Sequence, residues 1–307
     1  MEGTAQRMNQ PLVSIVMLAW NRKDDVRESL TRIRQIDYQN LEVIVVDNAS
    51  TDGTQDMVET EFPETRLLRM FKNIGIEAYN IGFENAKGEY LVIIDDDSFP
   101  APYAIRRMVE RFEADPQLGV LAFDVRNYYN YDDIKNELKN ADINTETAAI
   151  ANDYLMSFNG AGVGVRRDLF KKIGYYPEEF FLYNNEMDCA FKIWDAGYRI
   201  EFHADLVSYH KFSPKNRASW RAPFFYTRNA FWLAWKHYPA DMALKITMKL
   251  VYDCFYYSME QNTFVYIKAM WAAFREVGKL RGKRKAVQRH VAENLRVPFN
   301  LSFTFFR

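Results

Sequence analysis

The sequence contains few of the residues that form disulfides, zinc sites and histidine-based catalytic centres. Its 307 residues include only two cysteines, Cys189 and Cys254, and four histidines. Two cysteines this far apart match no zinc-type spacing and provide no disulfide framework. A reduced, cytosolic protein is therefore the default expectation.

The sequence also lacks an excess of one charge and a long apolar run. Forty basic residues balance 41 acidic ones, which argues against a general attraction to nucleic acid or to an anionic membrane. Residues 1–11 contain no apolar signal-peptide core. The longest apolar candidate, Met242–Ser258, is interrupted by three charged residues and falls short of the roughly 18 apolar residues that span a bilayer. We therefore expect a soluble or peripheral protein. It would be cytoplasmic and could bind peripherally to the inner face of the membrane.

Short apolar runs alternate with helical patterns over the first third of the chain. The runs predict strands at Val13–Trp20, Leu41–Asp47, Arg66–Phe71, Tyr90–Ile94 and Val120–Phe123, with helices at Asp24–Ile36, Gln55–Glu61, Glu77–Ala86 and Tyr103–Ala114. Such alternation predicts βαβ crossovers, an α/β fold and a mainly parallel sheet. In these sheets ligands bind beyond the carboxyl ends of the strands, where Trp20–Arg22, Asp47–Asn48 and Asp95–Asp97 stand.

The rest of the chain has a different character. Residues 124–157 are polar without a clear period, and we interpret them as a long excursion that could cover the site as a flap. A helix is expected at Arg167–Ile173, and two short strands at Arg199–His203 and Leu206–His210. From about residue 218 the pattern is helical, and its broad apolar faces must pack on each other, on the first domain, on a second subunit or on a membrane surface.

Asp95, Asp96 and Asp97 follow a buried strand directly and form the sharpest signal. Alternate side chains of an extended segment face the same way, so Asp95 and Asp97 can converge while Asp96 points elsewhere. Two convergent carboxylates suit a hard divalent cation, and that cation can hold a diphosphate. The structural alternative is a solvated acidic loop that caps the next helix, but three clustered carboxylates are costly without a cation.

Three segments together resemble the opening of the family 2 glycosyltransferases of the GT-A fold: VSIVMLAWNR, VIVVDNASTDGT and NIGIEAYNIGFENAKGEYLVIIDDDS. The likeness runs from Val13 to about Phe123. It implies a catalytic domain over residues 1–215, followed by a helical region over residues 216–307 that serves packing, oligomer formation or membrane contact.

The resemblance also implies roles for the residues at the strand ends. Donor-binding positions would be Trp20, Asn21, Asp47, Lys72, Asn73, Asp95 and Asp96, with Asp47 holding the nucleotide base. Asp97 would be the principal metal ligand, assisted by Asp95. The family also places a histidine after the strand that ends at His210, where it can complete the coordination of the metal.

A second acidic pair, Glu186 and Asp188, lies downstream in the segment FFLYNNEMDCAF. An inverting transfer needs a carboxylate that takes the proton of the acceptor hydroxyl. In the rhamnosyltransferase-like branch this segment contains two adjacent acidic residues, then one further residue, then Asp. This sequence has Asn185 at the first of the two acidic positions. We therefore predict Glu186 as the base and Asp188 as a residue that orients the site. The alternative is an acidic helix start favoured by the helix dipole.

The prediction is an inverting, metal-dependent and non-processive glycosyltransferase. It would use Mn²⁺ or Mg²⁺ and a UDP-, dTDP- or GDP-sugar, and its acceptor would be a glycan or lipid-linked glycan of cell-surface synthesis. A nucleotidyltransferase is an alternative, although Ala19–Arg22 contains no glycine for a triphosphate loop. A non-catalytic nucleotide-sugar-binding protein is another. Nucleic acid is not an expected partner. Two further possibilities stay open. The C-terminal helices could form a homo-oligomer, and the basic run Lys279–His290 is a candidate for peripheral membrane contact.

Overall fold

The computed structural model describes residues 10–128, 158–212 and 220–295, and its centre is one mixed, mainly parallel sheet of eight strands. The strands run in the order β3-β2-β1-β4-β7-β6-β8-β5. Their bounds are β1 (Val13–Ala19), β2 (Leu41–Asp47), β3 (Arg66–Arg69), β4 (Tyr90–Asp95), β5 (Ser98–Pro100), β6 (Leu118–Asn127), β7 (Val163–Arg166) and β8 (Arg199–His210). β1 to β4 are parallel, β7 is antiparallel to both of its neighbours, and β5 is antiparallel to β8.

The apolar strands form because both faces of the sheet are covered. Along β1, Ile15 and Met17 belong to one buried cluster and Val16 belongs to the other. Successive side chains of a strand point to opposite faces, so a strand buried on both sides is apolar at nearly every position. This is why β1 and β4 are continuous apolar runs in the sequence.

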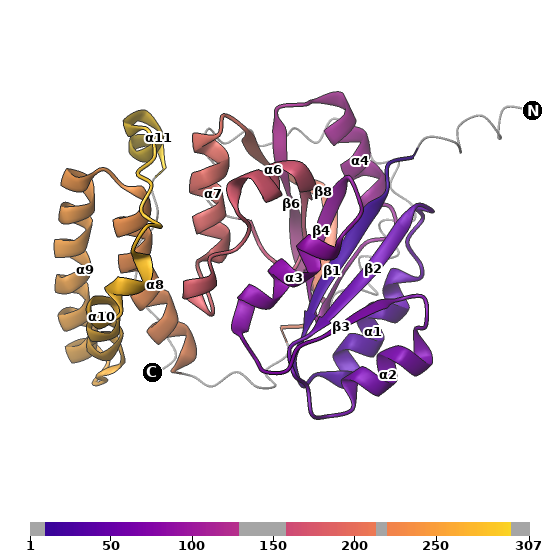
Figure 1. Cartoon of the computed structure of the whole chain (residues 1–307), viewed down its shortest axis with the longest axis horizontal. Coiled ribbons are helices and arrows are strands. Elements are labelled where there is room, and N and C mark those ends of the chain that lie inside the picture. The colour runs from indigo at the N-terminus through magenta and orange to yellow at the C-terminus, as the bar shows by residue number, and fades with distance from the viewer. Residues whose placement is uncertain (1–9, 129–157, 213–219, 296–307) are drawn as a thin grey trace, which may run out of the picture.

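Two layers of helices supply that cover. α1 (Lys23–Ile33), α2 (Thr54–Glu61) and α4 (Ala104–Ala114) pack on one face of the sheet, and α3 (Ala78–Asn85), α6 (Arg167–Ile173) and α7 (Asn185–Asp195) on the other. Figure 1 shows α3, α6 and α7 on the side of the sheet nearer the C-terminal helices.

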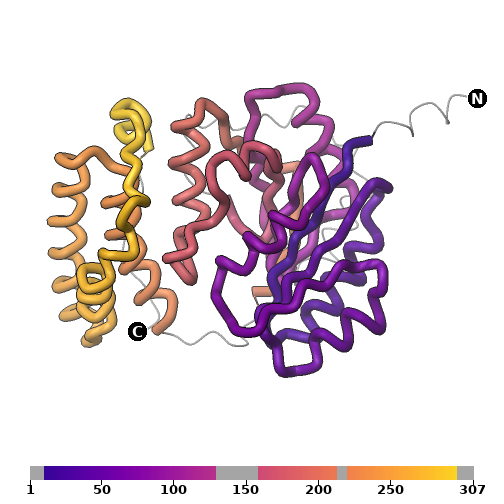
Figure 2. The backbone as a smooth tube through the Cα atoms, viewed as in Figure 1, coloured from indigo at the N-terminus to yellow at the C-terminus, as the bar shows by residue number. Residues whose placement is uncertain are grey.

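The C-terminal region is helical and packs on α7. It consists of α8 (Arg221–His237), α9 (Ala240–Glu260), α10 (Val265–Arg275), a 3₁₀ turn (Val277–Leu280) and α11 (Arg289–Asn294). Figure 2 shows α6 and α7 between the sheet and these helices. One buried cluster includes Phe180 and Phe191 before residue 215 and Trp232 and Tyr266 after it. The two parts therefore share a core, and the division at residue 215 stays a prediction. None of the helices among the described residues combines the length and apolar character that crossing a bilayer requires.

The predicted α/β fold is confirmed, with three differences in detail. β5 and β7 were not predicted as strands, because one is three residues long and the other begins within a glycine-rich stretch. The two short strands predicted at Arg199–His203 and Leu206–His210 are one strand with an irregularity after His203. The basic run Lys279–His290, part of the region expected to be helical, is mostly irregular chain between two short helical turns. The flap predicted over residues 124–157 lies largely outside the described residues.

The close approach of α3 to the sheet gives a test of this packing. A Cβ atom added at Gly82 would lie 2.5 Å from Cγ1 of Val16 and 2.9 Å from Cγ2 of Val46. Overpacking of this kind outweighs the helix-propensity gain of alanine, so we expect Gly82→Ala to lower the free energy of unfolding by about 1–2 kcal/mol. Urea denaturation measures the loss. Gly278→Ala is the matched control, because its Cβ would meet no atom within 4 Å, and an equal loss in both variants would contradict the packing described.

Candidate active site

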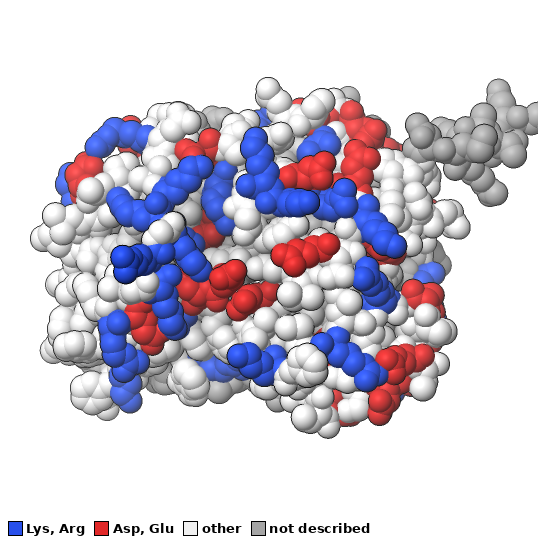
Figure 3. Space-filling model, viewed as in Figure 1, with Lys and Arg blue, Asp and Glu red and all other residues white. Residues whose placement is uncertain are grey.

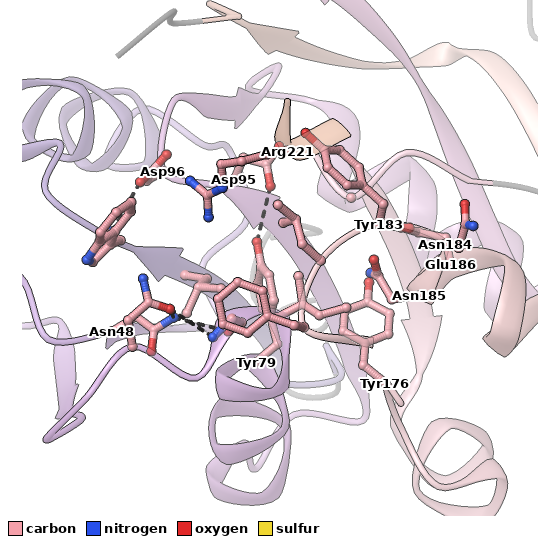
Figure 4. A pocket seen from close by; sticks show the side chains of 18 of the residues that line it. Asn48, Tyr79, Asp95, Asp96, Tyr176, Tyr183, Asn184, Asn185, Glu186 and Arg221 are labelled. Carbon is pink, nitrogen blue, oxygen red and sulfur yellow. Dashed lines mark hydrogen bonds between the residues drawn. The ribbon is translucent and has the colours of Figure 1, made fainter. Parts of the chain in front are cut away.

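A cavity of about 440 Å³ lies at the carboxyl end of the parallel strands. The strand ends meet there because the register aligns Ala19 of β1 with Asp47 of β2, and Leu18 with Asp95 of β4. Its walls come from these ends, from α3, from residues 181–184, from the first turn of α7 and from Arg221 of α8. Figure 4 shows Asp95 and Asp96 on one side of the cavity and Asn184, Asn185 and Glu186 on another, with Tyr79 and Tyr176 also in the wall.

Asp95, Asp97 and His210 converge at one edge of this cavity. His210 Nε2 lies 3.0 Å from Asp97 Oδ1 and 3.7 Å from Asp95 Oδ2, and one ligand atom from each residue lies within 4.8 Å of the others. The antiparallel pairing of β5 with β8 explains the contact, because it sets His210 opposite Ser98, next to Asp97. Two carboxylates and an imidazole suit a divalent cation such as Mn²⁺, so the residues present fit the predicted metal.

Asp96 has different surroundings from its two neighbours. Its carboxylate accepts hydrogen bonds from the Trp20 backbone N–H at 3.3 Å and from Arg22 Nη1 at 2.9 Å. Burial raises the pKa of Asp96 to about 7, although Arg22 opposes that shift. Arg22 Nη1 also lies 3.3 Å from Asp97 Oδ2, so one guanidinium contacts two of the three clustered carboxylates.

Glu186 stands in the first turn of α7 and is partly exposed to the cavity. Desolvation raises the pKa of its carboxyl group to about 7, and the negative charge of Asp95 adds to the rise. A Cβ atom at Gly160 would lie 3.0 Å from Glu186 Oε1, so the glycine leaves open space beside the carboxylate. A group with a pKa near 7 that faces a cavity is suited to accept a proton at neutral pH.

The predicted donor-binding residues are divided between the cavity and its surroundings. Trp20, Asn73, Asp95 and Asp96 line the cavity. The other three do not: Asn21 accepts a hydrogen bond from Thr51 N–H in the neighbouring loop, Lys72 is exposed, and Asp47 is buried.

Asp47 shows one feature that fits a ligand. Its Oδ1 accepts hydrogen bonds from Ser50 N–H and Gln55 Nε2, whereas the buried Oδ2 has no hydrogen-bond partner among the described residues. A buried carboxylate oxygen without a partner is costly, so a bound donor group would stabilise it. Its role in holding the base stays a prediction.

Asp188 does not line this cavity, so the idea that it acts in the site gains no support from its position. Its buried carboxylate lies 2.6 Å from Lys236 Nζ, 2.7 Å from His237 Nε2 and 2.9 Å from Lys192 Nζ. Burial alone would raise the pKa of Asp188, but these neighbours outweigh it and hold the pKa well below its usual range. The residue joins α7 to α8, and any effect on Glu186 would pass through the backbone of α7.

The loop before Glu186 has a strained backbone. Phe181, Tyr183 and Asn184 have backbone φ values of 62°, 66° and 63°. Residues other than glycine rarely adopt a positive φ. Such conformations cost roughly 1–3 kcal/mol each and persist only where the surroundings impose them.

Two side chains of α8 supply that constraint. Asn229 Nδ2 donates to the carbonyl oxygens of Phe180, Leu182 and Tyr183 at 3.2, 2.7 and 2.9 Å. Arg228 Nη2 donates to the Phe180 carbonyl at 2.6 Å. The C-terminal region therefore holds the cavity wall that leads into Glu186.

Several residues of the site were not singled out from the sequence. Arg22 was noted only as part of a polar cluster at a strand end, and Arg221 was given no role. Arg221 lines the cavity with its guanidinium carbon 5.7 Å from the centre of the Trp20 ring. Asn48 donates to Asn73 Oδ1 and to the carbonyl of Gly75, which fixes the loop after β3. The sequence could have indicated Asn48, because it follows Asp47 directly at the carboxyl end of a strand. Arg221 carried no such signal, because only the folded chain brings α8 to the cavity.

The comparison with protein families agrees with this geometry. Residues 14–174 match the family model described as glycosyl transferase family 2, which is more than half of the chain. The chain belongs to glycosyl transferase family 2. The rhamnosyltransferase-like branch stays a prediction.

Curated relatives of this family 2 chain cover parts of its length. Glycosyltransferase GlyG of Streptococcus pneumoniae is 31% identical over 129 residues, 40% of each chain. UDP-Glc:α-D-GlcNAc-diphosphoundecaprenol β-1,3-glucosyltransferase WfaP of Escherichia coli is 28% identical over 121 residues, 38% of this chain and 46% of WfaP. The chain thus spans less than two thirds of the length of these relatives.

Solved structures share the fold. A mannosyltransferase from Pyrobaculum calidifontis in complex with GDP-Man and Mn²⁺ matches 94% of this chain and 79% of its own, at a TM-score of 0.55 and 21% identity. Residues 1–349 of TarS from S. aureus, in complex with UDP-GlcNAc, match 73% of this chain and 65% of their own, at a TM-score of 0.57 and 18% identity. At these identities the likeness establishes the GT-A fold of the family 2 chain and not its substrates.

Removing the amide donor at position 229 tests how α8 holds the site. Asn229→Asp keeps the acceptor for Arg228 but removes the donor to three carbonyl groups. We expect the free energy of unfolding to fall by about 1–3 kcal/mol, because buried carbonyls lose their partner. Thr227→Val is the matched control on the same helix, since its buried hydroxyl has no hydrogen-bond partner among the described residues. Chemical denaturation that finds both variants equally stable would exclude the constraint.

Proposed function

We propose that this protein is an inverting, metal-dependent glycosyltransferase that moves a sugar from a nucleotide diphosphate to an acceptor hydroxyl. The observation that carries the proposal is one cavity with Asp95 and His210 at one wall, the buried Asp97 directly behind them, and a carboxylate of raised pKa, Glu186, at another wall. The family supports a glycosyl transfer, and the two carboxylate groups supply the two functions that an inverting transfer needs.

The residues around β4 would bind the donor. Asp95, Asp97 and His210 would hold Mn²⁺ or Mg²⁺, which when bound neutralises charge on the leaving diphosphate. Arg22 keeps Asp96 and Asp97 in place through its two ion pairs. Arg221 adds a positive charge to the same cavity, where it can contact a phosphate. Asp47 and Asn73 would contact the nucleoside.

Glu186 would accept the proton of the acceptor hydroxyl. As the hydroxyl oxygen forms its bond to the anomeric carbon, its proton passes to the Glu186 carboxylate. The bond between the anomeric carbon and the diphosphate oxygen breaks, and the electron pair leaves with the nucleoside diphosphate. Attack from the face opposite the leaving group inverts the anomeric carbon. Space beside Gly160 would admit the acceptor.

The relatives suggest substrate classes for this chemistry. The name of WfaP specifies a UDP-glucose donor and an acceptor linked to diphosphoundecaprenol, and the solved neighbours hold GDP-Man or UDP-GlcNAc. We therefore assign a UDP-, dTDP- or GDP-sugar as donor and a glycan or lipid-linked glycan of cell-surface synthesis as acceptor. Peripheral contact with the inner face of the membrane would give access to a lipid-linked acceptor.

Nucleotide binding can be tested without knowledge of the acceptor. We expect one of UDP, dTDP and GDP to raise the melting temperature in the presence of Mn²⁺ and to do so far less without it, because a ligand that binds the native state stabilises it by mass action. Asp97→Asn should abolish the metal-dependent increase. Thermal-shift measurements over the three nucleotides identify the donor class.

Asp168→Asn is the control for that experiment, because Asp168 is an exposed carboxylate in the first turn of α6. Its response to nucleotide and metal should equal that of the wild type. If no nucleotide raises the melting temperature under any condition, the metal-assisted donor site is refuted.

Glu186 gives a prediction about pH. Only the ionised carboxylate accepts a proton, and its pKa is raised to about 7, so kcat/KM for sugar transfer should increase as pH rises from 6 to 8. Glu186→Gln should lower transfer by about 10²–10⁴-fold, the range for loss of a general base, and should remove this pH dependence. Initial rates with saturating metal measure both effects.

Nucleotide binding distinguishes loss of the base from loss of the fold. Glu186→Gln should retain the metal-dependent thermal shift of the wild type. Transfer at the wild-type rate by this variant would exclude Glu186 as the base.

A further inference from the structure

The outer side of α9 is an apolar stripe that no described residue covers. The stripe consists of Leu244, Met248, Tyr252, Phe255 and Met259, and we call it the α9 face. Each of these side chains is half or more exposed, and Met259 reaches 83%. The spacing of four, four, three and four residues puts all five on one side of the helix.

This exposure is unusual for a helix that is otherwise well packed. The opposite side of α9 buries Leu250 and Cys254 in the shared core and contacts α8 and α10. Two further rings are exposed, Phe264 directly before α10 and Trp271 within α10. Contiguous apolar surfaces of this kind are typical of sites that bind a partner or a membrane.

The charge of the same region favours a negatively charged partner. Residues 240–295 contain ten lysines and arginines and five aspartates and glutamates, a difference of +5, whereas the whole chain has a net charge of −1. Figure 3 shows Lys and Arg side chains over the C-terminal helices as well as over the sheet domain. On α9, Lys245 and Lys249 are exposed beside the apolar stripe, and Lys249 Nζ pairs with the carboxylate of Asp253 on the same helix.

We propose that the α9 face binds the surface of a membrane that contains anionic lipids. An apolar stripe with aromatic rings, bordered by lysines, is the pattern of a helix that lies in the interface plane of a bilayer. The long stems of Lys245 and Lys249 allow their ammonium groups to reach the phosphates while the stripe enters the acyl boundary. α9 has 21 residues, so the helix could rest on the membrane over about 30 Å.

A second copy of the chain fits this surface less well. A second copy would bring the same net positive region, because residues 240–295 contain ten basic and five acidic residues. The exposed acids of α9, Asp241 and Glu260, stand at its two ends and not beside the stripe. Anionic lipid provides the opposite charge along the whole helix.

The position of α9 also relates membrane contact to the site. α9 packs on α8, and α8 begins with Arg221, which lines the cavity. Binding through α9 would therefore hold the helix that contributes to the cavity near the membrane, where a lipid-linked acceptor lies. This last step rests on the proposed function, whereas the membrane contact itself does not.

Vesicle binding by the full-length chain tests the proposal. We expect co-sedimentation with vesicles of phosphatidylcholine and phosphatidylglycerol, much weaker binding to phosphatidylcholine alone, and a decrease as salt is raised. Met248→Glu/Phe255→Glu should abolish binding. Lys245→Gln/Lys249→Gln should reduce the partition coefficient by about fivefold per lysine, because each basic residue near such a surface contributes about a factor of five.

The control carries the same added charge on a distant surface. Thr60→Glu/Gln117→Glu replaces two exposed residues of the sheet domain and should bind vesicles nearly as the wild type does. Equal binding by Met248→Glu/Phe255→Glu and the wild type, or no binding by the wild type, would overturn the proposal. So would a wild-type dimer, seen by sedimentation equilibrium without lipid, that Met248→Glu/Phe255→Glu converts to monomer. The nucleotide-dependent thermal shift in solution should be the same in all of these variants, which separates failure of this surface from failure of the donor site.

Discussion

The concentration of negative charge at the end of β4 is the constraint on which the candidate site depends. Asp95 is the last residue of β4, whose five preceding residues are buried, Asp96 and Asp97 follow it, and Arg22 contacts these two. Like charges this close disfavour simultaneous ionisation, and burial raises the pKa of Asp96 to about 7. A divalent cation relieves that repulsion, and its binding would therefore be favoured by the same geometry that the fold imposes.

The rest of the sheet is arranged around this cluster. The parallel register of β1, β2 and β4 brings the loops after these strands to one edge. The short antiparallel pair of β5 and β8 then carries His210 back to Asp97 across more than a hundred residues of sequence. Parallel strands supply the loops that would hold a nucleotide, and the antiparallel pair supplies the histidine that would be the third metal ligand.

The second half of the site depends on the C-terminal helices. Asn229 and Arg228 of α8 bind the carbonyl groups of a loop with three left-handed residues, and Asp188 of α7 is joined to Lys236 and His237 of α8. A loop in this conformation would relax without such partners. The helical region is therefore part of the wall that presents Glu186, as well as a surface on the outside of the molecule.

Much of the fold could be predicted because buried parallel strands are apolar at nearly every position. This pattern identified β1, β2 and β4 and the polar residues at their carboxyl ends. β5 and β7 escaped detection, since β5 is only three residues long and β7 begins within a glycine-rich stretch that carries no strand period. The expectation that His210 joins Asp97 came from family resemblance and not from the pattern.

The sequence by itself determined the alternation of the longer strands and helices and the chemical groups at the strand ends, because these depend on local periodicity and composition. Only the tertiary structure decided which acids face the cavity. Glu186 and Asp188 are two residues apart on α7, and their directions differ by about 200° at 100° per residue. One therefore meets the cavity and the other meets Lys236 and His237. The same is true of Arg221, whose place beside Trp20 follows from the packing of α8 and from no local signal.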